Sequence, residues 1–488
     1  MLGLAVGPCG LHRRQPAPCL VTDPSAHRAA PGRAGGGAHH CRALHLSEKQ
    51  KTRASRAHGP EEGSPCMTIA ASSNPPEVAY PASWYDGEGR LMLKNLTLEQ
   101  LSDWVVAALG EPRSRGMQLW RALYHSWPLL EDLRPTIGTP NGFSAAFVDR
   151  LTRVASLGGG MEVAGVSTAP DGTQKLACRL TTGPAAGMEV ECVLIPMPGS
   201  KPRTTVCISS QVGCAQNCQF CFTGRMGLLG QLSPAQIVQQ VVLAKRQARP
   251  GGVAKPPDPS SGPEVPVTNV VFMGMGEPLH NAGSVAVAVE VLTHPQGLGF
   301  PASRVCVSTV GLVPEMRAFA ARSRAALAVS LHATTDEVRN WLVPINRRHP
   351  LRELVAALEE LFPAEAQRAG RHVLVQYVLL RGVNDGEADA HRLADLLARV
   401  RCKVNLIGFN PHPGTRFAPS GERATQAFLA VLRQRGCVVM LRASRGGEEM
   451  AACGQLGGLA GGRGAGDGAL PRILPPPRRF EEVLAARS

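Results

Sequence analysis

The sequence predicts an α/β protein whose main part is a partial barrel of about six β/α units. From about Val206 onward, short apolar runs alternate with helical patterns. Strands that alternate with helices imply βαβ units and a parallel sheet. A stretch with helical periodicity precedes this part of the chain, and a strand-and-turn region lies between the two. We therefore expect a partial (β/α)6 barrel, a small N-terminal helical domain and a short β-rich connector.

These patterns divide the 488 residues into five segments. We expect a leader at 1–70, a helical domain at 90–150, a β-rich connector at 151–200, the barrel at 201–456 and a disordered tail at 457–488. The tail is rich in Gly, Pro and Arg, and segments of such composition bury too little apolar surface to fold. A Pro/Gly-rich insertion at 248–266 is most simply a surface loop.

Each element has its own signal. In the helical domain, Leu98, Leu101 and Val105 recur at helical spacing, and Gly110 predicts the end of that helix. In the connector, the turn sequence Ala-Pro-Asp-Gly-Thr at 169–173 joins two extended runs. In the barrel we expect strands at 205–209, 267–273, 304–309, 326–331, 372–379 and 403–408, and helices at 234–247, 284–293, 351–361 and 388–400.

The N-terminal leader carries much of the net charge of +14. Residues 1–60 contain nine Arg or Lys residues against only Asp23 and Glu48. An acid-poor, Arg-bearing N-terminus is typical of an organelle transit peptide, and the simpler alternative is a disordered tail. A basic excess favours a polyanionic partner, most commonly nucleic acid. No apolar run reaches the roughly 18 residues that span a bilayer, so we expect no membrane anchor.

The strongest chemical signal is a group of three cysteines, Cys214, Cys218 and Cys221, just after the predicted strand at 205–209. Fourteen cysteines in so long a chain are too sparse for a secreted disulfide scaffold, so we expect reduced thiols. Thiolates suit zinc or an iron–sulfur cluster. Structural zinc needs four ligands, and no fourth Cys or His lies at zinc-finger spacing. A four-iron cluster with one open iron is therefore favoured, and a zinc knuckle with a distant fourth ligand is the alternative.

Small polar residues follow several of the predicted strands. The loop Gly-Met-Gly-Glu-Pro at 274–278 offers two glycines that let the backbone approach a ligand closely. Its carboxylate can accept hydrogen bonds from the amino group of a bound amino-acid moiety. In an open α/β sheet or a barrel, ligands bind at the carboxyl ends of the strands. The strand-end residues of interest are Gly276, Glu277, Ser308, Ser330, Leu331, His332 and Asn410.

Two further cysteines complete the pattern. Cys207 lies seven residues before Cys214, and Cys453 lies in Met-Ala-Ala-Cys-Gly-Gln-Leu at 450–456. The spacing of the three clustered cysteines is that of radical S-adenosylmethionine enzymes. Together with Val-Pro-Ile-Asn-Arg-Arg at 343–348 and Phe-Asn-Pro-His-Pro-Gly at 409–414, these motifs closely resemble the bacterial-type RNA adenine carbon-2 methyltransferases. That family acts on large-subunit ribosomal RNA and transfer RNA, and the resemblance runs from about residue 96 to residue 456.

The resemblance implies a role for each motif. Cys214, Cys218 and Cys221 would hold one [4Fe-4S] cluster, and the strand-end residues named above would contact S-adenosylmethionine. Cys453 would carry the methyl group as S-methylcysteine, and Cys207 would release the product by forming a disulfide with it. Glu191 matches the family's proposed proton acceptor, and the alternative is an ordinary exposed strand carboxylate.

The implied chemistry explains this inventory. Carbon 2 of adenine is electron-poor and does not attack a methyl sulfonium, whereas a carbon radical can add to it. One molecule of S-adenosylmethionine would methylate Cys453 and a second would generate the radical, giving two per turnover. A base must then remove the ring proton, and a second thiol must release the product.

The resemblance also implies partners and a location. We expect ribosomal RNA, transfer RNA or both as substrate, with 90–150 as an RNA-binding domain, and a low-potential flavodoxin- or ferredoxin-type electron donor. We expect a monomer in the chloroplast, with the mitochondrion or cytoplasm as alternatives. Two other functions stay open: an adenine carbon-8 methyltransferase with the same machinery, and a catalytically silent iron–sulfur RNA-binding protein.

Overall fold

The computed structural model describes residues 80–125, 129, 131–199, 202–249, 266–365, 371–442, 445–457 and 473–485. The leader at 1–70 and most of the insertion at 248–266 lie outside the described residues. The described residues belong to one compact unit of the chain, which spans Ser73–Ser488. No described helix is long and apolar enough to cross a membrane.

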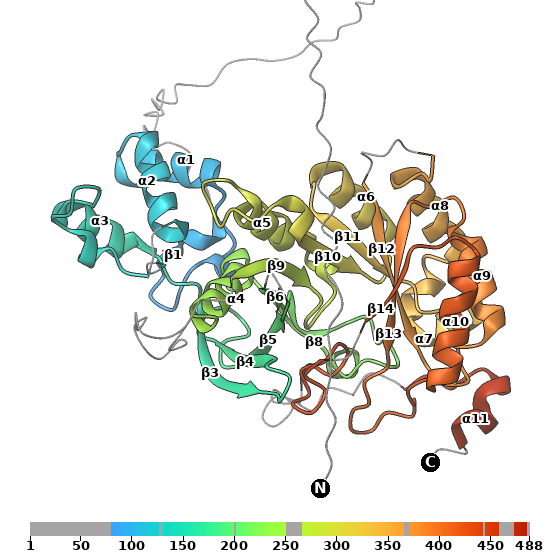
Figure 1. Cartoon of the computed structure of the whole chain (residues 1–488). Coiled ribbons are helices and arrows are strands. Elements are labelled where there is room, and N and C mark those ends of the chain that lie inside the picture. The colour runs from blue at the N-terminus through green and yellow to red at the C-terminus, as the bar shows by residue number, and fades with distance from the viewer. Residues whose placement is uncertain are drawn as a thin grey trace, which may run out of the picture. The chain divides into compact units, whose positions relative to one another are not determined.

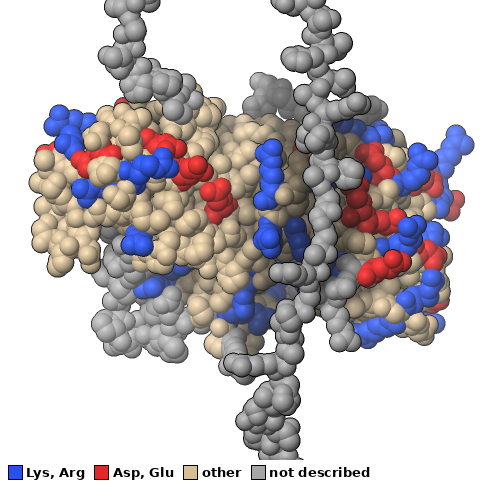
Figure 2. Space-filling model, turned by 90° about the horizontal axis from the view of Figure 1, so that it is seen from above, with Lys and Arg blue, Asp and Glu red and all other residues tan. Residues whose placement is uncertain are grey.

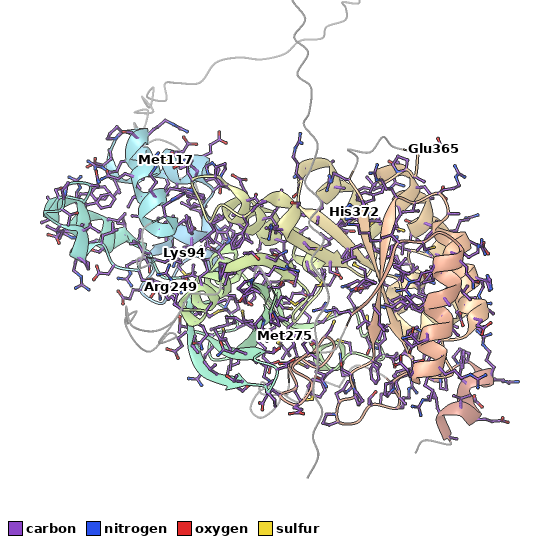
Figure 3. All side chains as sticks on the ribbon, in the orientation of Figure 1. Lys94, Met117, Arg249, Met275, Glu365 and His372 are labelled. Carbon is purple, nitrogen blue, oxygen red and sulfur yellow. The ribbon has the colours of Figure 1, made fainter. Side chains whose placement is uncertain are left out.

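Helices form the first part of this unit. They are α1 (Leu98–Leu109), α2 (Arg113–Tyr124) and α3 (Ala145–Val154), with the short parallel strands β1 (Leu91–Met92) and β2 (Ala155–Ser156) beside them. Helix α1 begins at a capping box formed by Thr97 and Gln100 and ends at Gly110, whose φ is 64°. Lys94, labelled in Figure 3, donates a hydrogen bond of 2.8 Å from Nζ to Gln239 Oε1. This buried contact attaches the helical part to the barrel.

A ten-stranded sheet forms the centre, in the order β14-β13-β12-β11-β10-β9-β6-β5-β4-β3. Its antiparallel part consists of β3 (Met161–Thr168), β4 (Gln174–Leu180) and β5 (Glu189–Met197). Strand β5 pairs with β6 (Arg203–Cys207), so that Val193 lies opposite Cys207. The connector therefore continues the sheet of the barrel.

Seven parallel strands make up the barrel part of this sheet (Figure 1). After β6 come β9 (Val267–Phe272), β10 (Val305–Thr309), β11 (Ala326–Ser330), β12 (Val373–Leu379), β13 (Cys402–Gly408) and β14 (Val439–Arg442). The helices between them are α4 (Pro234–Gln247), α5 (Ala282–Thr293), α6 (Val313–Arg322), α7 (Asp336–Leu342), α8 (Leu351–Leu361), α9 (Glu387–Leu397) and α10 (Glu422–Gln434). The predicted partial β/α barrel is confirmed. Its seventh strand, β14, was not predicted, because four residues show too little periodicity.

A hairpin of β7 (Gln211–Cys214) and β8 (Gly227–Gln231) flanks the cysteine motif at the end of the first barrel strand. Cys214 is the last residue of β7, and the connection to β8 holds Cys218 and Cys221. The hairpin thus presents them at the edge of the sheet where the parallel strands end.

The C-terminal segment forms the helix α11 (Glu481–Ala485), preceded by a 3-10 turn at Arg478–Phe480. Phe480 and Leu484 are buried in a small apolar cluster, where the Phe480 ring stacks on Trp341 with centroids 5.6 Å apart. The prediction of a disordered tail over 457–488 is therefore wrong for residues 473–485. These two apolar side chains find a preformed apolar surface, which the Gly- and Pro-rich composition of the tail does not reveal.

Candidate active site

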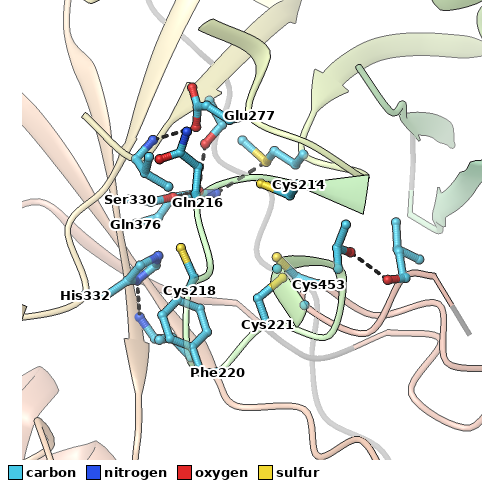
Figure 4. A pocket seen from close by; sticks show the side chains of 18 of the residues that line it. Cys214, Gln216, Cys218, Phe220, Cys221, Glu277, Ser330, His332, Gln376 and Cys453 are labelled. Atoms are coloured by element: carbon cyan, nitrogen blue, oxygen red, sulfur yellow. Dashed lines mark hydrogen bonds between the residues drawn. The ribbon is translucent and has the colours of Figure 1, made fainter. Parts of the chain in front are cut away.

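A cavity lies at the carboxyl ends of the parallel strands, and it is lined by most of the residues predicted from the sequence (Figure 4). The ends of five strands (β9 to β13) and the β7–β8 hairpin contribute to it, as expected for an open β/α barrel. The predicted residues that line it are Cys214, Cys218, Cys221, Gly276, Glu277, Ser308, Ser330, His332, Asn410 and Cys453.

The three clustered cysteines form one wall of the cavity. Their thiols are free and mostly buried, and their sulfur atoms face the same space in Figure 4. Burial raises the pKa of the Cys214 thiol to about 12 and also raises the pKa values of Cys218 and Cys221. A metal centre would reverse this effect, because a coordinating thiol is deprotonated.

The chemistry of these thiols bears on the kind of metal site. Within the described ranges, no group of three Cys, His, Asp or Glu side chains is arranged to hold a single metal ion. A structural zinc site needs four ligands around one ion. A [4Fe-4S] cluster takes its cysteines on different irons and suits soft thiolate ligands. The residues present therefore fit a cluster held by three thiolates.

Glu277 forms a second wall, in the loop after β9. Its side chain is 2% exposed, Oε1 accepts a hydrogen bond of 3.1 Å from Leu279 N, and Oε2 accepts one of 2.9 Å from Val310 N. Burial raises the pKa of this carboxyl to about 7. The preceding Gly276 has φ +99°, and a Cβ atom there would lie 2.6 Å from Gln211 Cβ. Any other residue at position 276 would therefore strain this loop.

Gln376 is a lining residue that sequence reasoning missed. Its Oε1 accepts hydrogen bonds from Ser308 Oγ at 3.2 Å and from Ser330 Oγ at 3.3 Å, so that one amide orients both predicted hydroxyls. The signal was present in the sequence. An amide inside the apolar run Val-Leu-Val-Gln-Tyr-Val-Leu, in a strand buried on both faces, needs polar partners.

His332 and Leu331 differ in their positions. His332 lines the cavity, and its Nδ1 accepts a hydrogen bond of 3.1 Å from Val378 N, which leaves Nε2 as the protonated nitrogen. Burial lowers the pKa of His332 to about 3, so the ring is neutral. Leu331, in contrast, does not line the cavity. Its side chain is buried in the core, and its carbonyl accepts a hydrogen bond from Arg339 Nε at 3.0 Å.

Cys453 lies on a loop at 445–457, which we call the carrier loop. Four hydrogen bonds join this loop to the barrel side, one of them from Gln455 Nε2 to Pro411 O at 2.6 Å. Asn410 Nδ2 donates to Cys453 O at 3.2 Å, Phe222 N donates to Gly454 O at 2.8 Å, and Thr223 Oγ1 donates to the carbonyl of residue 456 at 2.6 Å. Cys453 is near enough to raise the pKa values of both Cys207 and Cys221. Its thiol is therefore close to both Cys221 and Cys207.

Cys207 and Glu191 lie behind the carrier loop and do not line the cavity. Cys207, at the end of β6, is 8% exposed, and burial raises the pKa of its thiol to about 12. Glu191 is 1% exposed, so the alternative of an exposed strand carboxylate is wrong. Its Oε2 accepts a hydrogen bond of 2.8 Å from Gly457 N, and its Oε1 lies 3.5 Å from Lys175 Nζ.

Backbone strain concentrates at this site. Among the described residues, the non-glycine residues with positive φ are Asn217 at 51°, His332 at 57° and Met450 at 50°. One lies in the cysteine motif, one lines the cavity and one lies in the carrier loop. Such conformations cost about 1–3 kcal/mol each and persist where the surroundings determine them, which is common at functional sites.

The partial β/α barrel and the three-cysteine wall beside a Gly-Glu loop define a radical S-adenosylmethionine enzyme. The crystal structure of a radical SAM methyltransferase from Sphaerobacter thermophilus matches with a TM-score of 0.64 and 38% identity, covering 75% of this chain and 98% of that one. The Dual-specificity RNA methyltransferase RlmN of Geotalea uraniireducens is 42% identical over 366 residues, which are 75% of this chain and 96% of that protein. The protein of the same name from Syntrophotalea carbinolica is 40% identical over 378 residues, 76% of this chain and 91% of that protein. The chain belongs to the RlmN family of dual-specificity RNA methyltransferases. No model of a known protein family matches the chain.

Proposed function

We propose that this protein methylates carbon 2 of adenine in 23S-type ribosomal RNA and in transfer RNA, with Cys453 as the methyl carrier. The position of Cys453 carries this proposal. Among the described cysteines it alone is exposed, and it lines the same cavity as the three clustered thiols. A thiol in that position can meet both a cofactor bound in the cavity and an RNA base that enters from solvent.

The residues that line the cavity would bind the cofactors and orient S-adenosylmethionine. Cys214, Cys218 and Cys221 would hold one [4Fe-4S] cluster, which when bound supplies the electron that cleaves S-adenosylmethionine. Glu277 can accept hydrogen bonds from the amino group of that molecule, because its buried carboxylate already has fixed geometry. Ser308 and Ser330, oriented by the Gln376 amide, offer hydroxyls to its polar groups.

Three further residues, Cys453, Glu191 and Cys207, would act on the carbon that is transferred to the RNA. The Cys453 thiol takes up a methyl group and presents it to the base. Glu191 accepts the proton lost from carbon 2, and the Cys207 thiol releases the product by forming a disulfide with Cys453. This assignment is supported by the proximity of Cys453 to Cys207, since the Cys453 thiol contributes to the raised pKa of Cys207.

RNA binding is supported by the family and by the distribution of charge. On the face shown in Figure 2, Lys and Arg side chains run down the middle without Asp or Glu beside them, while both signs of charge are mixed toward the two sides. Arg347 and Arg348 are exposed in the loop after α7. Basic side chains of this kind contact phosphates, and the modified base must be unpaired or flipped to reach the cavity. We assign RNA binding also to the N-terminal helices at 90–150.

The experiment is anaerobic reconstitution of wild type and Cys453→Ala with both RNAs, followed by nucleoside mass spectrometry. Wild type is expected to yield 2-methyladenosine, and Cys453→Ala none. 8-Methyladenosine from wild type would instead identify the carbon-8 reaction. Absence of 5′-deoxyadenosine in the presence of S-adenosylmethionine and reductant would identify a silent RNA-binding protein. Methylation of carbon 2 by Cys453→Ala would overturn the carrier role.

We further propose that two molecules of S-adenosylmethionine are consumed per turnover, that the electron donor is a flavodoxin or ferredoxin, and that the protein is a monomer in the chloroplast. The basic, acid-poor composition of residues 1–60 supports the location. Fusion of these residues to a fluorescent protein tests it. Fluorescence in plastids is expected, and fluorescence in mitochondria or the cytosol would contradict it.

A further inference from the structure

A buried ion pair lies directly beneath the carrier loop. Lys175 on β4 is 5% exposed and Glu191 on β5 is 1% exposed, with 3.5 Å between Nζ and Oε1. Both residues point to the same face of the sheet, because Ala177 lies opposite Glu191 and Val193 opposite Lys175. Glu191 Oε1 accepts no hydrogen bond. Lys175 is therefore the charge partner of this buried carboxylate oxygen.

The same two side chains contact the carrier loop. Lys175 Nζ donates to Met450 O at 3.5 Å, and Glu191 Oε2 accepts from Gly457 N at 2.8 Å. Met450 and Gly457 lie on either side of Cys453. The ion pair therefore ties down the segment that bears the reactive thiol at both of its ends.

The anchor at Met450 opposes local strain. With φ at 50°, Met450 holds a conformation that costs a non-glycine residue about 1–3 kcal/mol. A contact must offset this cost if the loop is to stay in place. The ammonium group of Lys175, 3.5 Å from the Met450 carbonyl oxygen, contributes to this, since a charged donor forms a stronger hydrogen bond than a neutral one.

The closed loop has a second consequence. Cys207 and Glu191 are both buried behind it, although the proposed reaction needs both of them at the RNA-bound carbon. In the closed position Cys453 faces the cofactor cavity, and in an open position the loop would uncover the other two groups. Binding of the methyl donor and processing of the RNA adduct thus require different loop positions.

We propose that Lys175 is a positioning residue that, through its ion pair with Glu191 and its bond to Met450, latches the carrier loop in the closed position facing the cofactor cavity. Removal of the lysine charge leaves a buried carboxylate without a partner, which is strongly unfavourable, and releases the strained loop. The role of the closed position in methyl transfer rests on the proposed function. The contacts of Lys175 with Glu191 and Met450 do not depend on it.

The test measures how fast Cys207 is alkylated by iodoacetamide in the anaerobically reconstituted protein, with peptide mapping to separate it from the other thiols. A buried thiol reacts only when the structure over it opens, so the rate reports the open population. Lys175→Met is expected to raise the Cys207 rate about 10-fold, which corresponds to about 1.4 kcal/mol. Lys175→Arg, which keeps the charge, is expected to stay within about 3-fold of wild type.

Lys94→Met is the matched control. Lys94 is also a buried lysine with an amide and a carboxylate partner, but it lies among the N-terminal elements and not at the carrier loop (Figure 3). It is expected to lower stability without changing the Cys207 rate. Lys175→Gln retains a donor to Met450 without charge, and it provides a milder second variant if Lys175→Met does not fold. Its expected rate lies between those of wild type and Lys175→Met.

The outcomes are distinct. Equal Cys207 rates in wild type and in the folded Lys175→Met or Lys175→Gln variant would overturn the latch, as would an equal increase in Lys94→Met. Methylation of Cys453 by S-adenosylmethionine is measured on the same samples. If wild-type Cys453 is never methylated, the proposed function fails, while the alkylation rates still decide whether Lys175 holds the loop.

Discussion

The cysteine motif at 214–221 and the carrier loop at 445–457 both present thiols to one cavity, but they are built in opposite ways. The motif is compact, and its thiols are held by a local hairpin and by burial. The carrier loop is held by contacts with residues that are distant in the sequence, such as Asn410, Thr223 and Glu191. A metal ligand set needs fixed, buried thiols, whereas a group carrier needs an exposed thiol on a segment that can move. The two constructions match these two tasks.

The largest expected effect comes from the cysteine motif. Cys218→Ala removes a cluster ligand, and methylation of RNA is expected to fall by at least about 10³-fold because the remaining groups cannot act without the cluster. The iron content and the brown colour are expected to fall with it. Cys306→Ala, at a partly buried cysteine of β10 outside the cavity, is the control and is expected to keep both.

The next largest effect is expected at Cys207, the thiol behind the carrier loop. Cys207→Ser keeps the fold but cannot release the adduct, so turnover is expected to fall by about 10²-fold or more while Cys453 is still methylated. A protein–RNA adduct that survives denaturing electrophoresis is expected to accumulate. Release of 2-methyladenosine at the wild-type rate would exclude Cys207 as the resolving thiol.

This comparison also shows where sequence reasoning succeeds. The three clustered cysteines and most other cavity residues could be predicted, because their motifs lie at predictable strand ends. The burial of the Leu331 side chain beside the cavity could not be predicted, because a motif shows which residues are adjacent to the cavity but not which side chains face it. Lys175 was missed because its partner comes from another strand, and pairings between strands do not show in local patterns. Gln376 could have been singled out as an amide within an apolar strand, but its two serine partners lie on other strands and do not show in the local pattern. The ordered segment at 473–485 was missed for the same reason.

A smaller effect is expected at Gly276, in the loop that forms the second wall of the cavity. Gly276→Ala must move Gln211 and adopt a φ of +99°, so S-adenosylmethionine is expected to bind about 10-fold more weakly and the free energy of unfolding to fall by about 1–3 kcal/mol. Isothermal titration and denaturant unfolding measure the two quantities. Gly283→Ala in α5 is the control, because nothing lies within 4 Å of its added Cβ and alanine favours the helix. Unchanged binding in Gly276→Ala would contradict the role of this loop.

The smallest effect concerns the outer side of the cysteine motif. Leu474 N donates to Gln219 Oε1 at 2.9 Å, and Phe480 stacks on Trp341, so the C-terminal segment covers this motif from outside. Phe480→Ala is expected to speed the loss of cluster absorbance in air about 3-fold, because loss of the ring loosens the segment locally. Arg479→Ala, which removes an exposed ion pair with Glu337, is expected to change that rate little. Equal bleaching of Phe480→Ala and wild type would show that the segment does not protect the motif.

The central claim is that Cys453 carries the methyl group to the RNA. The most direct measurement follows an isotopically labelled methyl group of S-adenosylmethionine by mass spectrometry of the Cys453 peptide and of the RNA over time. The account predicts that the label appears on Cys453 before RNA is added and then moves to carbon 2 of adenine. Label that reaches the RNA while Cys453 stays unmodified would contradict it.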